Sequence, residues 1–248
     1  MKNVLLKHRS IRKFRPTPIP EEVLQNCLEA AARASTCGNM QLYSLVVTRD
    51  KALRERLAPC HFNQPMLKQA PCLVTVCADV HRFTMWCEQR GADPAYDNLV
   101  WFLNAATDAL LAAQNFCVQA EMHGLGICYL GTTLYTAAEI IQILELPKGV
   151  IPLTTVVVGY PDETPELTDR LPLDAVVHYE KYSDYTAAEI DELWAEREES
   201  EQTRRLLEEN GLENLAKVFT ERRYVRRDNL VFSESYFALL KEQGFFNQ

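Results

Sequence analysis

Short apolar runs punctuate the first two-thirds of the chain and predict strands. Segments rich in β-branched residues occur at 42–48, 72–80, 126–131 and 154–160. The second of these, CLVTVCADV, is almost continuously apolar. Such a run is typical of a strand that is buried on both faces.

Longer periodic segments predict helices between these strands. They fall at 2–8, 20–33, 50–57, 63–70, 97–123 and 136–145. The segment 97–123 is the longest and is apolar nearly all round, which predicts a central helix packed by other elements or by a second subunit. Gly124 follows it as a C-cap.

The order of these elements favours an α+β class over a doubly wound sheet, because no regular crossover helices separate the strands. We expect one domain over 1–248, a layered fold with a central mixed β-sheet flanked by helices. The last third differs in its charge pattern. Residues 186–210 hold nine acids against three arginines and predict a solvated helix, whereas 217–227 hold five Lys or Arg against one Glu. With a final amphipathic helix at 233–243, residues 186–248 predict a C-terminal helical extension.

Composition narrows the possible functions. The 248 residues are 47% hydrophobic and 24% charged, with a net charge of -8, which excludes disorder and disfavours nucleic acid as a partner. No apolar run approaches the ~18 residues of a membrane span, so no membrane is expected. Eight cysteines without a C-x-x-C pair, and no evident signal peptide, predict a reducing cytoplasm.

Three segments carry candidate chemistry. The basic stretch 8–14 offers arginine donors suited to phosphate, or is a solvated arm. The polar stretch 35–41 suits ligand contacts, or is a turn after a helix. The glycine cluster 124–131 follows a helix and opens a strand, the reverse of the dinucleotide fingerprint. A Rossmann site is therefore excluded, although close approach of this backbone to a flat ligand stays possible.

Two other groups of residues give weaker evidence for a functional site. Cys60 and His61 are adjacent in a loop, and adjacent residues rarely form a thiol–imidazole pair. His81, Cys87 and Glu88 match no metal-ligand spacing, so no metal site is expected.

Taken in order, these motifs resemble the nitroreductase family of FMN-dependent oxidoreductases. The motifs are RSIRKF, ASTCGNMQ, the long apolar helix followed by GLGICYLG, and the arginine of LTDRLPLDAVVHYEKY. The tail, RRDNLVFSESYFALLKEQGF, is similar to the NADPH-dependent major nitroreductase and flavin reductase subgroup. The resemblance covers essentially the whole chain.

The resemblance also implies a set of binding residues. The FMN-binding residues would be His8, Arg9, Ser10, Arg12, Ser35, Thr36, Cys37, Asn39, Gln69, Leu130, Gly131, Thr132 and Arg170. The nicotinamide dinucleotide would be bound by Arg222 and Arg227. Thr168 stands where the subgroup usually has a lysine, and Asp169 adds a negative charge beside Arg170, which puts the strength of phosphate binding in question.

The implied activity is hydride transfer from NADPH or NADH to FMN, followed by transfer to a nitroaromatic, quinone, azo or flavin acceptor in a ping-pong cycle. No side chain would be catalytic, because the chemistry takes place at FMN N5. The resemblance further implies a homodimer with FMN at the subunit interface and the C-terminal extension covering the active site or the partner subunit. Two alternatives stay open: a dehalogenase or flavin-fragmenting enzyme of the same fold, and a non-catalytic flavin-binding protein.

Overall fold

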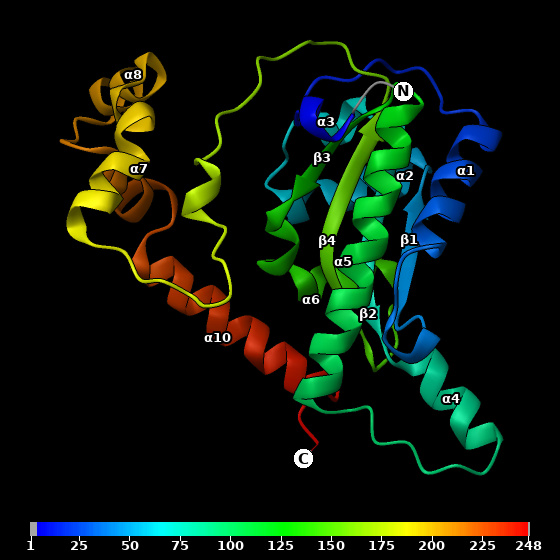
Figure 1. The fold of residues 1–248 in the computed structure, drawn as a ribbon. Coiled ribbons are helices and arrows are strands. Elements are labelled where there is room, and N and C mark those ends of the chain that lie inside the picture. The colour runs from blue at the N-terminus through cyan, green and yellow to red at the C-terminus, as the bar shows by residue number, and fades with distance from the viewer. Residues whose placement is uncertain (1–3, 248) are drawn as a thin grey trace. The chain divides into compact units, whose positions relative to one another are not determined.

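The fold is built on one four-stranded sheet in the order β1-β2-β4-β3 (Figure 1). A computed structural model describes residues 4–247. The strands are β1 (Tyr43–Thr48), β2 (Cys72–Asp79), β3 (Gly126–Leu130) and β4 (Val150–Gly159). All three strand pairs are antiparallel, so the prediction of a mixed sheet is wrong in that detail. Outside these strands, Ser10 forms one isolated parallel bridge with Ile127.

Helices cover both faces of this sheet, which confirms the layered α+β class. On one face α1 (Glu21–Ala32) packs against α5 (Leu99–Met122), and α5 contacts all four strands. Figure 1 shows α5 running along the sheet. The other face holds α2 (Lys51–Leu57), α3 (Met66–Gln69) and α6 (Ala137–Leu144).

The central strand β2 contributes side chains to two buried clusters, because successive side chains alternate between the faces of the sheet. Cys72, Val74 and Val76 join the cluster beneath α1 and α5, whereas Leu73 joins the cluster beneath α2 and α6. All eight residues of β2 are buried, as the continuous apolar run predicts.

The long helix α5 begins where Asn98 accepts a hydrogen bond from Trp101 N at 3.2 Å. Fully buried Ala105, Ala109 and Ala112 let its backbone come close to its neighbours. The contacts of α5 with all four strands and with α1 confirm the predicted central position of this helix in the chain.

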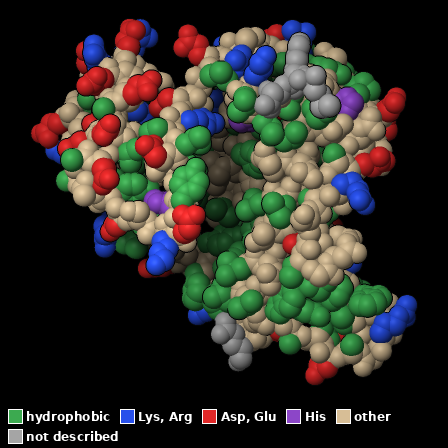
Figure 2. Space-filling model, viewed as in Figure 1, with side chains coloured by type: hydrophobic (Ala, Val, Ile, Leu, Met, Phe, Trp, Pro, Cys, Tyr) green, Lys and Arg blue, Asp and Glu red, His purple; other side chains and the backbone are tan. Residues whose placement is uncertain are grey.

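The chain divides into two compact units. The first contains residues 1–166 and 234–248, and the second contains Leu167–Ser233. The second unit holds α7 (Ala187–Glu199), α8 (Glu201–Asn210), α9 (Leu215–Val218) and the first part of α10 (Arg226–Glu242). Acidic side chains gather over α7 and α8 (Figure 2). The organisation as a single domain over 1–248 stays a prediction.

Several predicted boundaries differ from the structure. The helix predicted at 186–210 is two helices, because Ser200 adopts ψ 148° and caps α8 by accepting from Thr203 N at 3.1 Å. The last helix begins at Arg226 rather than 233. Sequence periodicity missed α4 (His81–Gln89). The helix predicted at 2–8 is a 3₁₀ turn at Leu5–Lys7, and residues 1–3 lie outside the described part.

Short 3₁₀ turns complete the framework at Cys37–Asn39 (η2), Ala58–His61 (η3), Gly131–Leu134 (η4) and Leu173–Ala175 (η5), with a π-helical turn at Phe219–Arg223 (η6). Over residues 4–247, every helix is too short or too polar to cross a membrane.

Candidate functional site

The basic N-terminal stretch is an ordered arm that lies along the sheet. Ile11 N donates to Ile127 O at 2.9 Å, and Arg15 N donates to Tyr160 O at 2.9 Å. The side chains of Ile11 and Phe14 are buried in the cluster beneath α2 and α6. The apolar residues of the stretch therefore fix it between β3 and the end of β4, so it is more than a solvated tail.

Two glycines make room for this arm. A Cβ on Gly126 would lie 2.5 Å from Ile11 Cγ1, and a Cβ on Gly159 would lie 3.1 Å from Phe14 Cδ1. The small size of Gly126 thus serves the arm and not a ligand, which corrects part of the interpretation of 124–131. At Gly131, by contrast, a Cβ would meet no atom of the described residues within 4 Å.

The polar side chains of the arm differ in how they are engaged. Arg9 Nε is buried and has no hydrogen-bond partner among residues 4–247. Ser10 is half-buried and Arg12 is exposed. His8 Nδ1 lies 2.6 Å from Glu121 Oε1 on α5, so its ring is already paired. The arm therefore offers arginine and hydroxyl donors, whereas a role for His8 at FMN stays a prediction.

Glu163 supports the arm from the segment after β4, and sequence reasoning missed it. Its Oε1 accepts from Arg12 N at 2.5 Å and from Lys13 N at 2.9 Å. The carboxylate thereby fixes the backbone that carries Arg12. An acid shortly after a strand gives no periodic signal by which it could have been found.

Gln69 and the end of β3 lie on the same face of the sheet as the arm. Gln69 Oε1 accepts from Phe14 N at 3.4 Å. Leu130 shares the buried cluster of Ile11 and Phe14, and it leads into Gly131 and Thr132 in η4. The structure therefore brings together three of the predicted groups: residues 8–12, Gln69 and 130–132.

His61 contacts Thr132, one of the predicted site residues, through its buried ring. The ring is fully buried, its Nδ1 lies 2.9 Å from Thr132 Oγ1, and its Nε2 has no partner in the described part of the chain. Burial lowers the pKa of His61 to about 4, so the ring is neutral at pH 7. In the sequence His61 is notable only as the neighbour of Cys60, so its contact with Thr132 was not predicted.

The second predicted segment lies at the opposite end of the sheet. Ser35, Cys37 and Asn39 are exposed before β1, whose first residue Tyr43 pairs with Ala78. Ala78 pairs with Ile151 at the start of β4, whereas the arm meets residues 160 and 161 beyond its other end. Both segments also contact α5, Cys37 at Asp108 and His8 at Glu121. These two positions are 13 residues apart (121 − 108), or about 20 Å along the helix at 1.5 Å per residue. Within this chain the arm is therefore not brought together with Ser35, Thr36, Cys37 and Asn39.

The remaining predicted residues belong to the second unit. Arg170 Nη1 donates to Thr168 Oγ1 at 2.7 Å, and Asp169 pairs with Arg197 at 3.1 Å. The negative charge beside Arg170 is thus balanced within this unit. Arg222 donates to Glu221 O at 3.4 Å, and Arg227 pairs with Asp228 at 2.9 Å.

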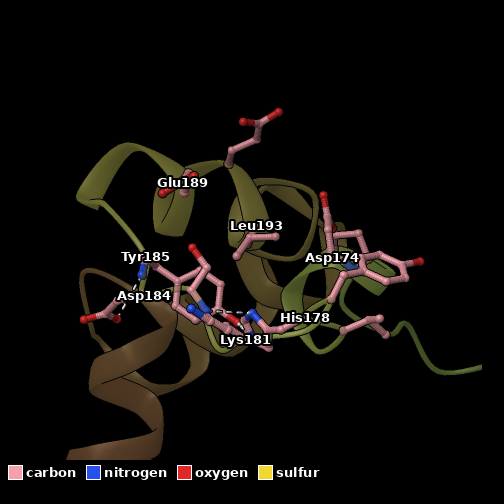
Figure 3. A pocket seen from close by; sticks show the side chains of 12 residues that line it. Asp174, His178, Lys181, Asp184, Tyr185, Glu189 and Leu193 are labelled. Atoms are coloured by element: carbon pink, nitrogen blue, oxygen red, sulfur yellow. Dashed lines mark hydrogen bonds between the residues drawn. The ribbon is translucent and has the colours of Figure 1, made fainter.

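The second unit also contains a cavity of about 560 Å³ (Figure 3). His178 Nε2 lies 3.2 Å from Tyr185 Oη, and Tyr185 donates to Ala175 O at 2.9 Å. None of the predicted cofactor or nicotinamide residues lines it. Its lining residues are Pro172, Asp174, Val177, His178, Tyr179, Lys181, Ser183, Asp184, Tyr185, Glu189, Glu192 and Leu193.

The residues around the arm fit FMN by their chemistry. Arg9 and Arg12 provide fork-shaped donors for phosphate, and Ser10 provides a neutral donor. The unpartnered buried Nε of Arg9 and the open space at Gly131 are the features expected of a site for a phosphorylated, flat ligand. Within residues 4–247, no group of three or more His, Cys, Asp or Glu could hold a metal ion.

The sequence that forms this fold and carries Arg9 and Arg12 matches a known family. The chain belongs to the nitroreductase family, whose family model matches residues 5–160.

Individual relatives extend the match. FMN reductase (NADPH) from Bacillus subtilis is 33% identical over 181 residues, covering 72% of this chain and 73% of the relative. A Bacteroides fragilis crystal structure, described as a candidate oxidoreductase, is 50% identical with a TM-score of 0.97 and covers 99% of this chain and 100% of that chain. The structure of NADPH:FMN oxidoreductase from Vibrio harveyi, complexed with NAD+, is 28% identical with a TM-score of 0.81. The match covers 98% of this chain and 97% of that chain. The expected family and fold are confirmed.

Proposed function

We propose that the protein is an FMN-dependent oxidoreductase that takes hydride from NADPH or NADH and passes it to a small electron acceptor. The observation that carries this proposal is the buried, unpartnered Nε of Arg9 in an arm that also presents Ser10 and Arg12. Membership of the nitroreductase family and the similarity to an FMN reductase (NADPH) support the same activity.

FMN supplies the hydride chemistry when it is bound, and the side chains supply binding and orientation. Arg9, Ser10 and Arg12 bind the phosphate, ribityl and pyrimidine end. Gln69, Leu130, Gly131 and Thr132 orient the ring, since they lie on the face of the sheet that carries the arm. A cation such as Arg12 near the pyrimidine favours the reduced, negatively charged flavin.

The protein works as a homodimer with FMN at the subunit interface. The segment 35–39 and the arm contact α5 at positions about 20 Å apart, so a site that uses both draws them from two copies. The outer face of α5 suits such an interface: Val100, Leu103 and Leu110 are 64%, 55% and 48% exposed at helical spacing.

The second unit contributes the remaining contacts in this proposal. Arg170 binds the FMN phosphate, while Arg222 and Arg227 bind the phosphates of the nicotinamide dinucleotide. Their exposure and positive charge support these roles. The extension at 186–248 covers the active site or the partner subunit.

A cytoplasmic location accompanies this function. All eight cysteines are free, and seven of them are buried. A chain that keeps this many thiols unpaired is suited to a reducing compartment.

The purified protein tests the activity directly. It is expected to be yellow or to become yellow with added FMN, and anaerobic NADPH or NADH should bleach the flavin band. Bleaching by dithionite alone would instead support the non-catalytic flavin-binding protein. Failure to take up FMN would refute the proposed function.

A second measurement distinguishes the proposed activity from a dehalogenase or a flavin-fragmenting enzyme. After reduction by the nicotinamide and removal of excess donor, a nitroaromatic, quinone, azo compound or free flavin should restore the oxidised spectrum with intact FMN. Reoxidation by a halogenated aromatic alone, or loss of the flavin itself, would favour the alternatives.

A further inference from the structure

The loop 37–42 lies between two charged side chains from different helices. Asp108 on α5 accepts from Cys37 N at 2.8 Å through Oδ1 and from Leu42 N at 3.2 Å through Oδ2. Arg82 on α4 donates to the carbonyl oxygens of Gln41 and Tyr43. The carboxylate therefore holds the N–H groups of this segment, and the guanidinium holds its carbonyl groups.

The loop needs such support because its backbone is strained. Asn39 and Gln41 have φ of 56° and 52°, in the left-handed region that residues other than glycine rarely adopt. The amide of Gln41 donates to Asn39 O at 2.9 Å, which stiffens the loop from within. Strained backbone of this kind persists where the surrounding structure fixes it, and it clusters at functional sites.

Asp108 is also an unusual residue for its place in α5. Asp108 is 2% exposed, and its neighbours on the same face of the helix are Ala105 and Ala112. A buried carboxylate is unfavourable unless it is fully hydrogen-bonded, and alanine would satisfy the packing of this face. Both carboxylate oxygens of Asp108 instead accept hydrogen bonds from N–H groups of the loop.

Both charges act on Tyr43, the first residue of β1. Burial raises the pKa of Tyr43; Arg82 lowers it and Asp108 raises it to a smaller extent. Asp79 also lies beside Arg82, at 3.7 Å. Asp108 and Arg82 therefore form a clamp, in which one side chain from α5 and one from α4 bind the backbone of the same loop.

We propose that Asp108 and Arg82 are positioning residues that hold 35–41 in the shape in which it contacts FMN in the site of a second copy of this chain. The inference rests on the proposed function, because it needs that segment to be a flavin contact. Since Asp108 is part of α5, the helix whose outer face we assign to the dimer also sets the shape of the flavin loop.

Asp108→Asn tests the proposal, because the amide keeps the volume but cannot accept from both N–H groups. Titration of the apoprotein with FMN should show a dissociation constant raised about tenfold or more, as expected for lost charge-assisted hydrogen bonds. The midpoint potential of the bound flavin should shift as well, which a loss of stability alone would not cause. Arg82→Met should raise the dissociation constant about threefold, since the arginine is half-exposed.

Leu24→Ala is the control for lost stability. Leu24 is buried in the first turn of α1, in the cluster beneath α1 and α5 and outside the cluster that holds the arm, so this variant loses stability without removing a contact of Asp108 or Arg82. Its FMN dissociation constant should stay within about twofold of the wild type at a temperature where it is folded. An equal rise in Leu24→Ala and Asp108→Asn would overturn the proposal.

Two further outcomes separate this inference from the proposed function. If the wild type binds no FMN, the proposed function fails. If the wild type binds FMN and Asp108→Asn binds it with unchanged affinity and potential, the clamp fails while the proposed function stands. If Asp108→Asn does not fold, Arg82→Met decides: unchanged FMN affinity together with faster amide exchange in 36–42 overturns the inference.

Discussion

At the scale of single residues, the site depends on a few side chains whose burial and partners differ from what their type suggests. Arg9 has a buried, unpartnered Nε, and His61 is fully buried and neutral. A buried polar atom without a partner is unfavourable, so the Nε of Arg9 gains when an anionic ligand binds beside it.

Arg9→Ala should weaken FMN binding more than a comparable change elsewhere in the arm. We expect the FMN dissociation constant to rise about tenfold or more, since charge-assisted hydrogen bonds to phosphate are lost. Arg15→Ala is the control, because Arg15 is 63% exposed and pairs with Asp162. Equal losses in the two variants, measured by flavin fluorescence quenching, would show that Arg9 has no special role.

His61 should make the protein less stable in mild acid. Its pKa of about 4 lies below the 6.5 of the unfolded chain, so between these values the unfolded state binds a proton that the folded state does not. Stability is therefore present above pH 6.5 and is lost as the pH falls.

The magnitude can be measured with a variant. From pH 7 to pH 5, His61 should account for about 2 kcal/mol of lost unfolding free energy. Urea unfolding of His61→Gln should show a pH dependence that is shallower than that of the wild type by this amount. Identical pH dependences in the two proteins would contradict the assignment.

At the scale of elements, α5 has two faces with different tasks. Its inner face is lined by Ala105, Ala109 and Ala112 and packs on the sheet, whereas its outer face exposes Leu103 and Leu110. A helix that is apolar on both sides needs cover on both sides.

Leu110→Glu should convert the proposed homodimer to monomers, because it places a charge at the interface without changing the inner core. Light scattering after size-exclusion chromatography measures the mass directly. Phe62→Glu is the control, since Phe62 is 59% exposed outside α5. A dimer that persists in Leu110→Glu would move the interface away from this face.

At the scale of the whole molecule, the antiparallel sheet sets which segments can meet. The arm lies beyond one end of β4, and the segment 35–39 lies near its other end. A complete site of the proposed kind therefore requires two chains.

Subunit mixing tests this arrangement. When one protomer carries Arg9→Ala and its partner carries Thr36→Ala, one of the two sites combines an intact arm with an intact segment 35–39. Such heterodimers should retain about half of the wild-type turnover, because that site is unaltered. Activity as low as in the two mutant homodimers would mean that each site comes from a single chain.

The sequence by itself determined the α+β class, the continuous apolar β2, the central helix α5 and the family. These features follow from local periodicity and from the order of short motifs, and both can be recognised without knowing which residues are in contact. It placed strand β4 only in part, starting it at 154 instead of Val150. It also missed the break at Ser200, because a single N-cap hardly alters the charge pattern of a solvated helix.

Only the tertiary structure decided how the candidate site is held. Gly126 makes room for Ile11, Glu163 supports the backbone of Arg12, and Asp108 holds a loop that lies 66 residues away from it at Leu42. These contacts join residues that are distant along the chain, so no local pattern records them. The strand register likewise separated two segments that the motifs had placed in one site, because the length of β4 keeps them apart within a single chain.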